Sequence, residues 1–261
     1  MKRNKIKPKY LKIIDNQKKE EKNSKSEPNI FDKFEKLIIN TLISLGLILL
    51  LLVWSYIPMT ILALFNINYT NFNEFGKIIY MLICDILLLL ILIKIYHKDF
   101  FQNFHDYFHH NFKENLKESF RYWGIGIIIM IISNLIITIL TNGRIATNEE
   151  AVRELIQISP LYMAFELIIY APISEELIFR KSIYNITKNR YIYILLSGLI
   201  FGGLHAISSF NSLIDLLYLI PYCALGFTFA ALYSKTNNIF STITIHSIHN
   251  TLALILYLIT L

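Results

Sequence analysis

Long apolar runs constrain this chain more than any other feature of its sequence. The stretches 47–53 and 124–132 contain only apolar residues and glycine, and a soluble domain would have to hide them all in its core. A bilayer accommodates them directly, because a helix needs about 20 mostly apolar residues to cross it. Since 54% of the residues are hydrophobic and the mean hydropathy is +0.47, we expect an integral membrane protein.

Runs of the required length predict an all-α fold class, a polytopic membrane bundle of about seven transmembrane helices. The first run contains Pro58, and a break there would raise the count to eight. The expected spans are 37–65, 78–96, 122–141, 161–184, 191–209, 213–233 and 239–260.

We expect three regions along the chain. Residues 1–36 form a basic arm without stable structure, and 37–141 form N-terminal spans with an amphipathic connection over 97–121. Residues 142–261 form the core that holds the polar motifs described below.

The charge is concentrated in the arm, which holds twelve Lys/Arg against six Asp/Glu and so accounts for the whole net charge of +6. A basic tail beside a span is typical of orientation signals and anionic lipid, so we expect no nucleic-acid partner. If the arm is inside, 22 of the 25 Lys and Arg residues fall on the inner side. The positive-inside rule therefore predicts a multi-pass protein of the cell membrane with a cytoplasmic N-terminus.

Two other groups of residues suggest metal or thiol chemistry only weakly. Cys84 and Cys223 lie in apolar segments without metal-type spacing, which favours buried core cysteines. His105 and His109 have an i, i+4 spacing that can bind zinc, but no third ligand follows in a recognisable pattern. Phenylalanines at four-residue spacing across the same stretch favour a helix that lies along the membrane surface.

Polar side chains inside the apolar segments are the candidates for function. A charge in the hydrocarbon costs about 2.5–3.5 kcal/mol on insertion scales, so a charge that is retained needs a reason. Three clusters lie on three predicted spans near the C-terminus: Glu175-Glu176-x-x-x-Arg180, Phe201-x-x-x-His205 and His246-x-x-x-Asn250.

Helix geometry separates the two adjacent glutamates. Glu176 and Arg180 are four residues apart and share a face, so they can pair. Glu175 points about 100° away and is left as the candidate general base. Taken alone, this motif fits a membrane-edge ion pair with a spectator glutamate equally well.

The other two clusters matter through their combination with the first. A single histidine in a membrane helix, such as His205, more often packs against a neighbouring helix than takes part in catalysis. The two glycines before it favour a close approach of its helix to another helix. Together, the clusters provide a base for water, a group that orients the water, and donors for a developing oxyanion. Amide hydrolysis needs this combination, and the four side chains that supply it are Glu175, His205, His246 and Asn250.

Depth along the spans argues against convergence of the site. Counting about 1.5 Å per residue places Glu175 and His246 in the cytoplasmic half and His205 deeper. Tilt, a kink at Pro172 or a later start of the fifth span would reconcile the three.

The ordered motifs resemble the CPBP family of intramembrane endopeptidases, which includes CAAX prenyl proteases and bacteriocin-processing or immunity proteins of the Abi group. The resemblance covers roughly residues 160–260, and no motif residue is substituted. It implies that Glu175 and His205 activate water and that His246 and Asn250 stabilise the oxyanion. The supporting residues that it implies are Glu176, Arg180 and Phe201.

The resemblance leaves the catalytic type open between a metalloprotease and a glutamate-type enzyme. The His-Glu-x-x-His signature is absent from the chain. Glu175, His205 and His246 could still supply three ligands to a divalent metal such as zinc, and no other cofactor is expected.

We therefore predict an intramembrane endopeptidase with a cavity open toward the cytoplasm. Its partners would be the bilayer and a membrane-embedded or lipid-anchored protein or peptide substrate. The Lys-, Ile- and Asn-rich composition is typical of AT-rich bacterial genomes, which favours peptide maturation, bacteriocin immunity or regulation of surface proteins. The alternatives are a catalytically silent scaffold or regulator of the same fold, and a small transporter or proton relay.

Overall fold

The computed structural model describes residues 29–54, 56–187, 189–207 and 213–261. The chain divides into two compact units, Met1–Ile39 and Asn40–Leu261. Of the first unit, residues 30–39 form the first turns of helix α2 (Ile30–Val53). Most of the predicted basic arm therefore lies outside the described residues.

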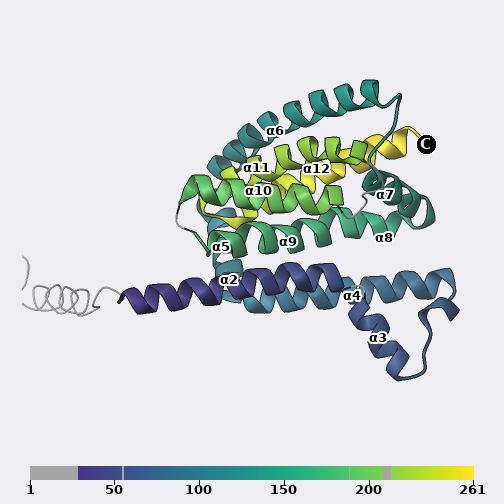
Figure 1. The fold of residues 1–261 in the computed structure, drawn as a ribbon, viewed down its shortest axis with the longest axis horizontal. Helices are drawn as coiled ribbons and strands as arrows, with labels where there is room; N and C mark the ends of the chain where they lie inside the picture. Colours follow the sequence, from purple (N-terminus) through teal and green to yellow (C-terminus); the bar gives the residue numbers. More distant parts are fainter. Residues whose placement is uncertain (1–28, 55, 188, 208–212) are drawn as a thin grey trace, which may run out of the picture. The chain divides into compact units, whose positions relative to one another are not determined.

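Within its described residues, the second unit is built from helices alone, which confirms the all-α prediction (Figure 1). Segments η1 and η4 are 3-10 helices, whereas η2 and η3 are π-helices. After α2 the order is α3 (Tyr56–Leu64), η1 (Tyr69–Asn71), α4 (Glu74–Ile95), α5 (His97–His109), α6 (Phe112–Leu140), α7 (Thr147–Ile158), α8 (Pro160–Phe165), η2 (Glu166–Tyr170), α9 (Ala171–Glu175), η3 (Glu176–Ser182), α10 (Arg190–Ile207), η4 (Leu213–Tyr218), α11 (Leu219–Thr236) and α12 (Ile239–Ile259).

Six helical stretches in the described ranges are long and apolar enough to cross a membrane: α2, α4, α6, α10, η4 with α11, and α12. Residues 160–184 form a further continuous helical stretch, divided into α8, η2, α9 and η3 by changes in helix type. Counting this segment 160–184 gives the predicted number of about seven.

Two predicted boundaries differ from those in the structure. The first predicted span consists of two helices, and the break precedes Pro58, which lies in the first turn of α3, where a missing N–H is tolerated. Helix α6 begins at Phe112, ten residues earlier than predicted, so the connection that follows α4 is mainly the single helix α5.

Alternation of helix direction gives the second unit two ends (Figure 1). The α5 end contains α5 and the turns after segment 160–184 and after α11. The α7 end contains α7, the end of α10 and the C-terminus. At the α5 end, Asn103 Oδ1 accepts a hydrogen bond from Ile239 N at 2.8 Å. At the α7 end, Gln157 Nε2 donates to the Tyr257 hydroxyl at 2.9 Å.

Glycines allow α10 and α11 to pack with their backbones close together. A Cβ on Gly226 would lie 2.8 Å from the Gly198 carbonyl oxygen, and a Cβ on Gly202 would lie 2.7 Å from Cys223 N. A Cβ on Gly203 would meet nothing within 4 Å. Only Gly202 of the two glycines before His205 therefore serves this close approach.

Candidate active site

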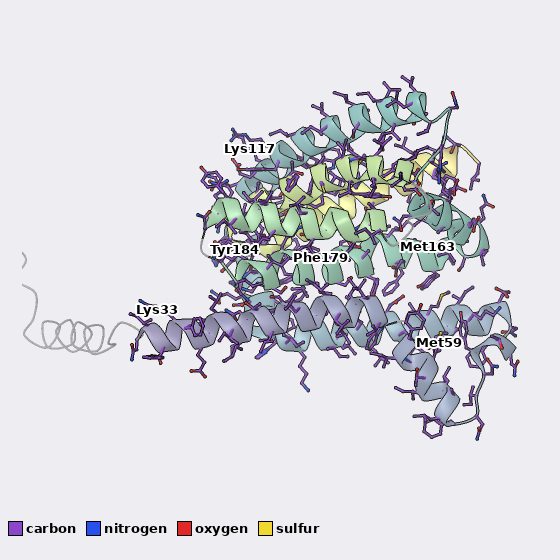
Figure 2. The ribbon with its side chains drawn as sticks, in the orientation of Figure 1. Lys33, Met59, Lys117, Met163, Phe179 and Tyr184 are labelled. Atoms are coloured by element: carbon purple, nitrogen blue, oxygen red, sulfur yellow. The ribbon has the colours of Figure 1, made fainter. Side chains whose placement is uncertain are left out.

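Segment 160–184 carries the two glutamates and is irregular where they lie. The π-helical stretches η2 and η3 flank α9, and single π turns of this kind are frequent at functional sites. Figure 2 shows its side chains, with Met163 and Phe179 labelled along it.

The π geometry and Pro172 together remove the usual α-helical donors of two backbone carbonyls of η2. Ala171 N bonds to Glu166 O, one residue further back than in an α-helix, and Pro172 has no N–H to offer. The carbonyls of Leu167 and Ile168 instead accept hydrogen bonds from side chains of α12. Asn250 Nδ2 donates to Leu167 O at 2.9 Å, and Ser247 Oγ donates to Ile168 O at 2.8 Å.

Glu176 and Arg180 form the predicted ion pair, with 3.2 Å between Glu176 Oε2 and Arg180 Nε. Neither side chain is exposed, and the contact is close without being aligned as a hydrogen bond. The guanidinium carbon lies 4.4 Å from the centroid of the Phe201 ring, a cation–π contact that strengthens on desolvation. Phe201 therefore supports the pair.

Glu175 lies between two imidazoles that come from different helices. Its Oε1 is 3.8 Å from His205 Nε2, and its Oε2 is 3.8 Å from His246 Nε2. The Glu175 and His205 side chains are 17% and 23% exposed, in contrast to the fully buried ion pair. The structure thus brings together the acid of segment 160–184 and the histidines of α10 and α12.

The proton positions on His205 follow from its hydrogen-bond partner. Its Nδ1 lies 3.0 Å from the Phe201 carbonyl oxygen, which can only accept, so Nδ1 carries the hydrogen. In the neutral ring Nε2 then presents a lone pair toward Glu175. The gap of 3.8 Å between Nε2 and Oε1 is too long for a direct hydrogen bond. It accommodates a water oxygen at about 2.8 Å from each atom, which could donate to both.

His246 has a different partner on its Nδ1. Glu176 Oε1 lies 3.0 Å away, and this carboxylate is kept ionised by Arg180, so Nδ1–H donates to it. Nε2 then carries a second hydrogen only in the doubly protonated ring, whose charge Glu176 offsets. His246 can donate from Nε2 only in this form.

Asn250 is positioned by its hydrogen bond to the Leu167 carbonyl. One hydrogen of its amide group is used there, and the other remains for a substrate oxygen. Asn250 lies four residues after His246 and shares its helix face.

A metal site formed by Glu175, His205 and His246 stays a prediction. The two His–Glu distances are 3.8 Å, close to the separation of ligand atoms in a tetrahedral site. Across the described ranges, however, the only His, Cys, Asp or Glu trio whose ligand atoms all lie within 4.8 Å of one another is on α5. The chemistry proposed below therefore uses side chains alone.

The structure also shows polar residues that the sequence interpretation missed. The Tyr162 hydroxyl donates a hydrogen bond to Asp85 Oδ2 at 2.9 Å. Asp85 is the single charged residue between Lys77 and Lys94 in an apolar helix, and that isolation was the signal available in the sequence.

A cavity of about 490 Å³ adjoins the site from the α7 end. It is bounded by α6, α7, α11 and α12 and includes Asn250 and His249, but not Glu175, His205 or His246, among its lining residues. Trp123 Nε1 donates to His249 Nδ1 at 3.3 Å, so His249 faces α6 rather than the catalytic acid. The wall combines apolar side chains with a few polar ones, as is common in ligand-binding sites.

Comparison with known proteins gives matches to this same part of the chain. Residues 157–252 match the family described as Type II CAAX prenyl endopeptidase Rce1-like, a range that contains all three motifs. No solved structure gives a significant match.

Two bacterial relatives show how far the similarity extends. The “Putative membrane peptidase YdiL” of Bacillus subtilis (strain 168) is 39% identical over 119 residues, which are 44% of this chain and 45% of that protein. The match thus spans less than half of the length of that relative. The “UPF0177 protein YxdF” of Lactococcus lactis subsp. lactis (strain IL1403) is 30% identical over 132 residues, 48% of this chain and 71% of that protein. With the helical bundle and the motif residues described above, these similarities show that the chain belongs to the CPBP family, the Rce1-like CAAX prenyl endopeptidase family of membrane proteases.

Proposed function

We propose that the chain is an intramembrane endopeptidase that hydrolyses a peptide bond in a membrane-associated protein or peptide. The observation that supports this proposal is the position of Glu175, whose two carboxyl oxygens each lie 3.8 Å from the Nε2 atom of a histidine. That spacing suits a water molecule held for attack, and Glu176 and Arg180 keep the surrounding charge paired.

Each group has one task in the proposed reaction. Water donates hydrogen bonds to Glu175 and His205, and Glu175 takes a proton as the water oxygen bonds to the substrate carbonyl carbon. The carbonyl oxygen becomes an oxyanion that accepts hydrogen bonds from His246 Nε2–H and from the remaining N–H of Asn250. Glu175 then returns its proton to the leaving amine as the C–N bond breaks.

The cavity indicates the side from which the substrate arrives. Its lining extends from Asn250 to Arg153 and Thr260 at the α7 end, and the positive-inside rule makes that end the outer one. The sequence alone predicts an opening toward the cytoplasm instead. We favour substrates that reach the site from outside, in peptide maturation, bacteriocin immunity or regulation of surface proteins.

Cleavage by the purified chain in lipid nanodiscs tests the proposal. A library of quenched membrane peptides serves as the substrate, with the Glu175→Gln and His205→Ala variants measured in parallel. Removal of the base or of its water-orienting partner should lower the rate by at least about 10²-fold. A chelator should leave the wild-type rate unchanged.

Matched controls separate chemistry from folding. Glu74→Gln and His97→Ala change the same residue types at exposed positions near helix ends, and their rates should equal that of wild type. The thermal unfolding midpoint of each variant is measured in the same nanodiscs. If variants with wild-type midpoints cleave as fast as wild type, or if wild type cleaves no peptide, a catalytically silent scaffold becomes the better description.

A further inference from the structure

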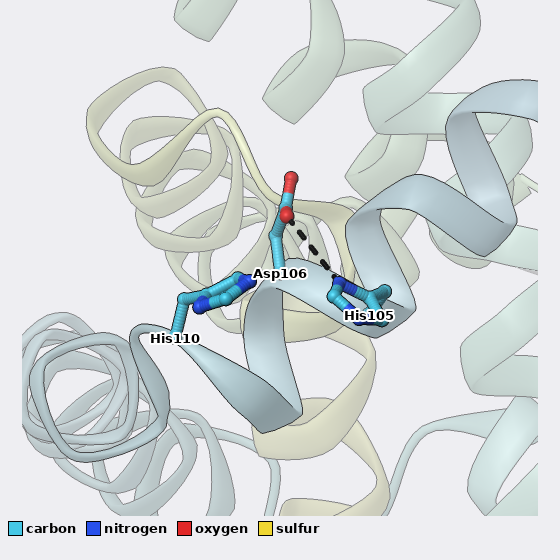
Figure 3. A group of neighbouring side chains, drawn as sticks. All are labelled: His105, Asp106 and His110. Atoms are coloured by element: carbon cyan, nitrogen blue, oxygen red, sulfur yellow. Dashed lines mark ion pairs between the residues drawn. The ribbon is translucent and has the colours of Figure 1, made fainter.

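The C-terminal turn of α5 gathers metal-ligating side chains that the proposed reaction does not use. Figure 3 shows His105 and His110 on either side of Asp106. One ligand atom from each of these three residues lies within 4.8 Å of the other two. The sequence interpretation found no third ligand beside the histidine pair at i, i+4, because His110 and Asp106 do not follow a known spacing pattern.

The separations are close to those of a bound transition metal ion. His105 Nδ1 lies 3.8 Å from Asp106 Oδ1, and bonds of about 2.0–2.1 Å place tetrahedral ligand atoms about 3.4 Å apart. The His105 and Asp106 side chains are 61% and 44% exposed, so small rotations about their side-chain torsions can close the remaining gap. The His109 ring, 4.7 Å from that of His105 between centroids, is available as a fourth ligand.

The electrostatic surroundings favour a cation. The three residues lie at the carboxyl end of a helix, and His110 is its C-cap residue, so the helix dipole presents its negative end there. Asp106 also lines a polar cavity of about 320 Å³. The cation in that cavity, Lys181, is paired with Asp99 at 2.7 Å, which reduces its repulsion of a metal ion.

We propose that His105, Asp106 and His110 bind one divalent transition metal ion of the zinc type, at a site separate from the catalytic residues. Imidazole ligands select such ions over Mg²⁺ and Ca²⁺, which prefer oxygen ligands. The same helix holds the start of α12 through Asn103 and through ring contacts of Phe104 with Phe240. A bound ion would therefore stabilise the junction of α5 with the helix that carries His246.

Metal titration of the full chain tests this site without reference to activity. The protein is prepared without a histidine tag, stripped of metal, and titrated with Zn²⁺ by calorimetry and with Co²⁺ by visible absorption. One ion should bind per chain, and the His105→Ala and His110→Ala variants should each weaken binding by at least about tenfold. His97→Ala, which removes a histidine from the first turn of the same helix, should bind as wild type does.

A catalytic-site variant distinguishes the two locations. Glu175→Gln should bind the ion as tightly as wild type and show the same Co²⁺ spectrum. If Glu175→Gln abolishes binding while His105→Ala and His110→Ala retain it, the ion belongs to the catalytic site and the α5 site is wrong. Absence of saturable binding to the wild-type chain would also overturn the proposal.

Discussion

The two site histidines differ in the group that accepts their Nδ1 hydrogen. A neutral carbonyl accepts from His205, whereas the ionised Glu176 accepts from His246. A neutral acceptor suits a neutral ring whose Nε2 takes a hydrogen bond from water, and a carboxylate suits a charged ring that donates. Two chemically identical side chains are thus assigned different roles by their partners.

Asn250 and Ser247 offer a matched pair for separating a positioning role from a catalytic one. Each donates a hydrogen bond to a carbonyl of η2, so Asn250→Ala and Ser247→Ala should each destabilise the fold by about 1 kcal/mol. Only Asn250→Ala should also lower kcat, by about 10²-fold, because it alone removes an oxyanion donor. Peptide cleavage and thermal unfolding of both variants provide the comparison. Equal rates in the two variants would limit Asn250 to positioning.

At this scale, the sequence predicts contacts within a helix better than contacts between helices. The Glu176–Arg180 pair follows from four-residue spacing alone. The bond from Asn250 to Leu167 depends on a carbonyl that is released by a π turn, and no spacing rule predicts where such a turn falls. The role of Asp85 is not predicted because its partner Tyr162 lies far from it in the sequence.

Helices approach closely where glycine leaves no side chain between them. In α10, Gly202 makes such a contact and the neighbouring Gly203 does not, so Gly203 serves as the control. Gly202→Ala would place a Cβ 2.7 Å from Cys223 N, against backbone that cannot move aside easily. We expect it to destabilise the fold by about 1–3 kcal/mol. Gly203→Ala meets open space and should be neutral or stabilising by up to about 1 kcal/mol through helix propensity.

Unfolding midpoints of the two variants in mild detergent measure the difference. Similar destabilisation by both would show that helix flexibility, rather than the contact with α11, explains these glycines.

Hydropathy located the spanning elements but not all of their limits. Apolar length predicted the helices well because the bilayer sets it. Helix α6 extends back to Phe112 because Asn115 and Ser119 are buried against the protein, with 9% and 0% of their surface exposed, and a hydropathy profile treats such residues as loop. The expectation that His205 lies too deep in the membrane to reach Glu175 is also wrong. Helix α10 begins at Arg190 rather than later, and His205 still approaches Glu175.

For the whole molecule, the proposed path of the substrate, from the α7 end through the cavity to Asn250, can be tested by blocking the cavity. Ala253 lines the cavity one turn beyond Asn250, whereas Ile255 on the same helix is exposed and does not line it. Ala253→Phe should fill the route and lower kcat/KM at least about tenfold, mainly through KM. Ile255→Phe should cleave like wild type. A normal rate for a folded Ala253→Phe variant would mean that the substrate enters elsewhere.

The docking of α12 on η2 has a further consequence for the bundle. A regular α-helix uses its own carbonyls, and two helices packed by apolar side chains alone can slide past each other by a small step at little cost. Here the two carbonyls that accept hydrogen bonds from α12, those of Leu167 and Ile168, lie just before Pro172. A shift of α12 along its neighbour would leave both carbonyls without these donors. The alignment of Glu175 with the last helix is therefore set by the π turn of η2 together with Pro172.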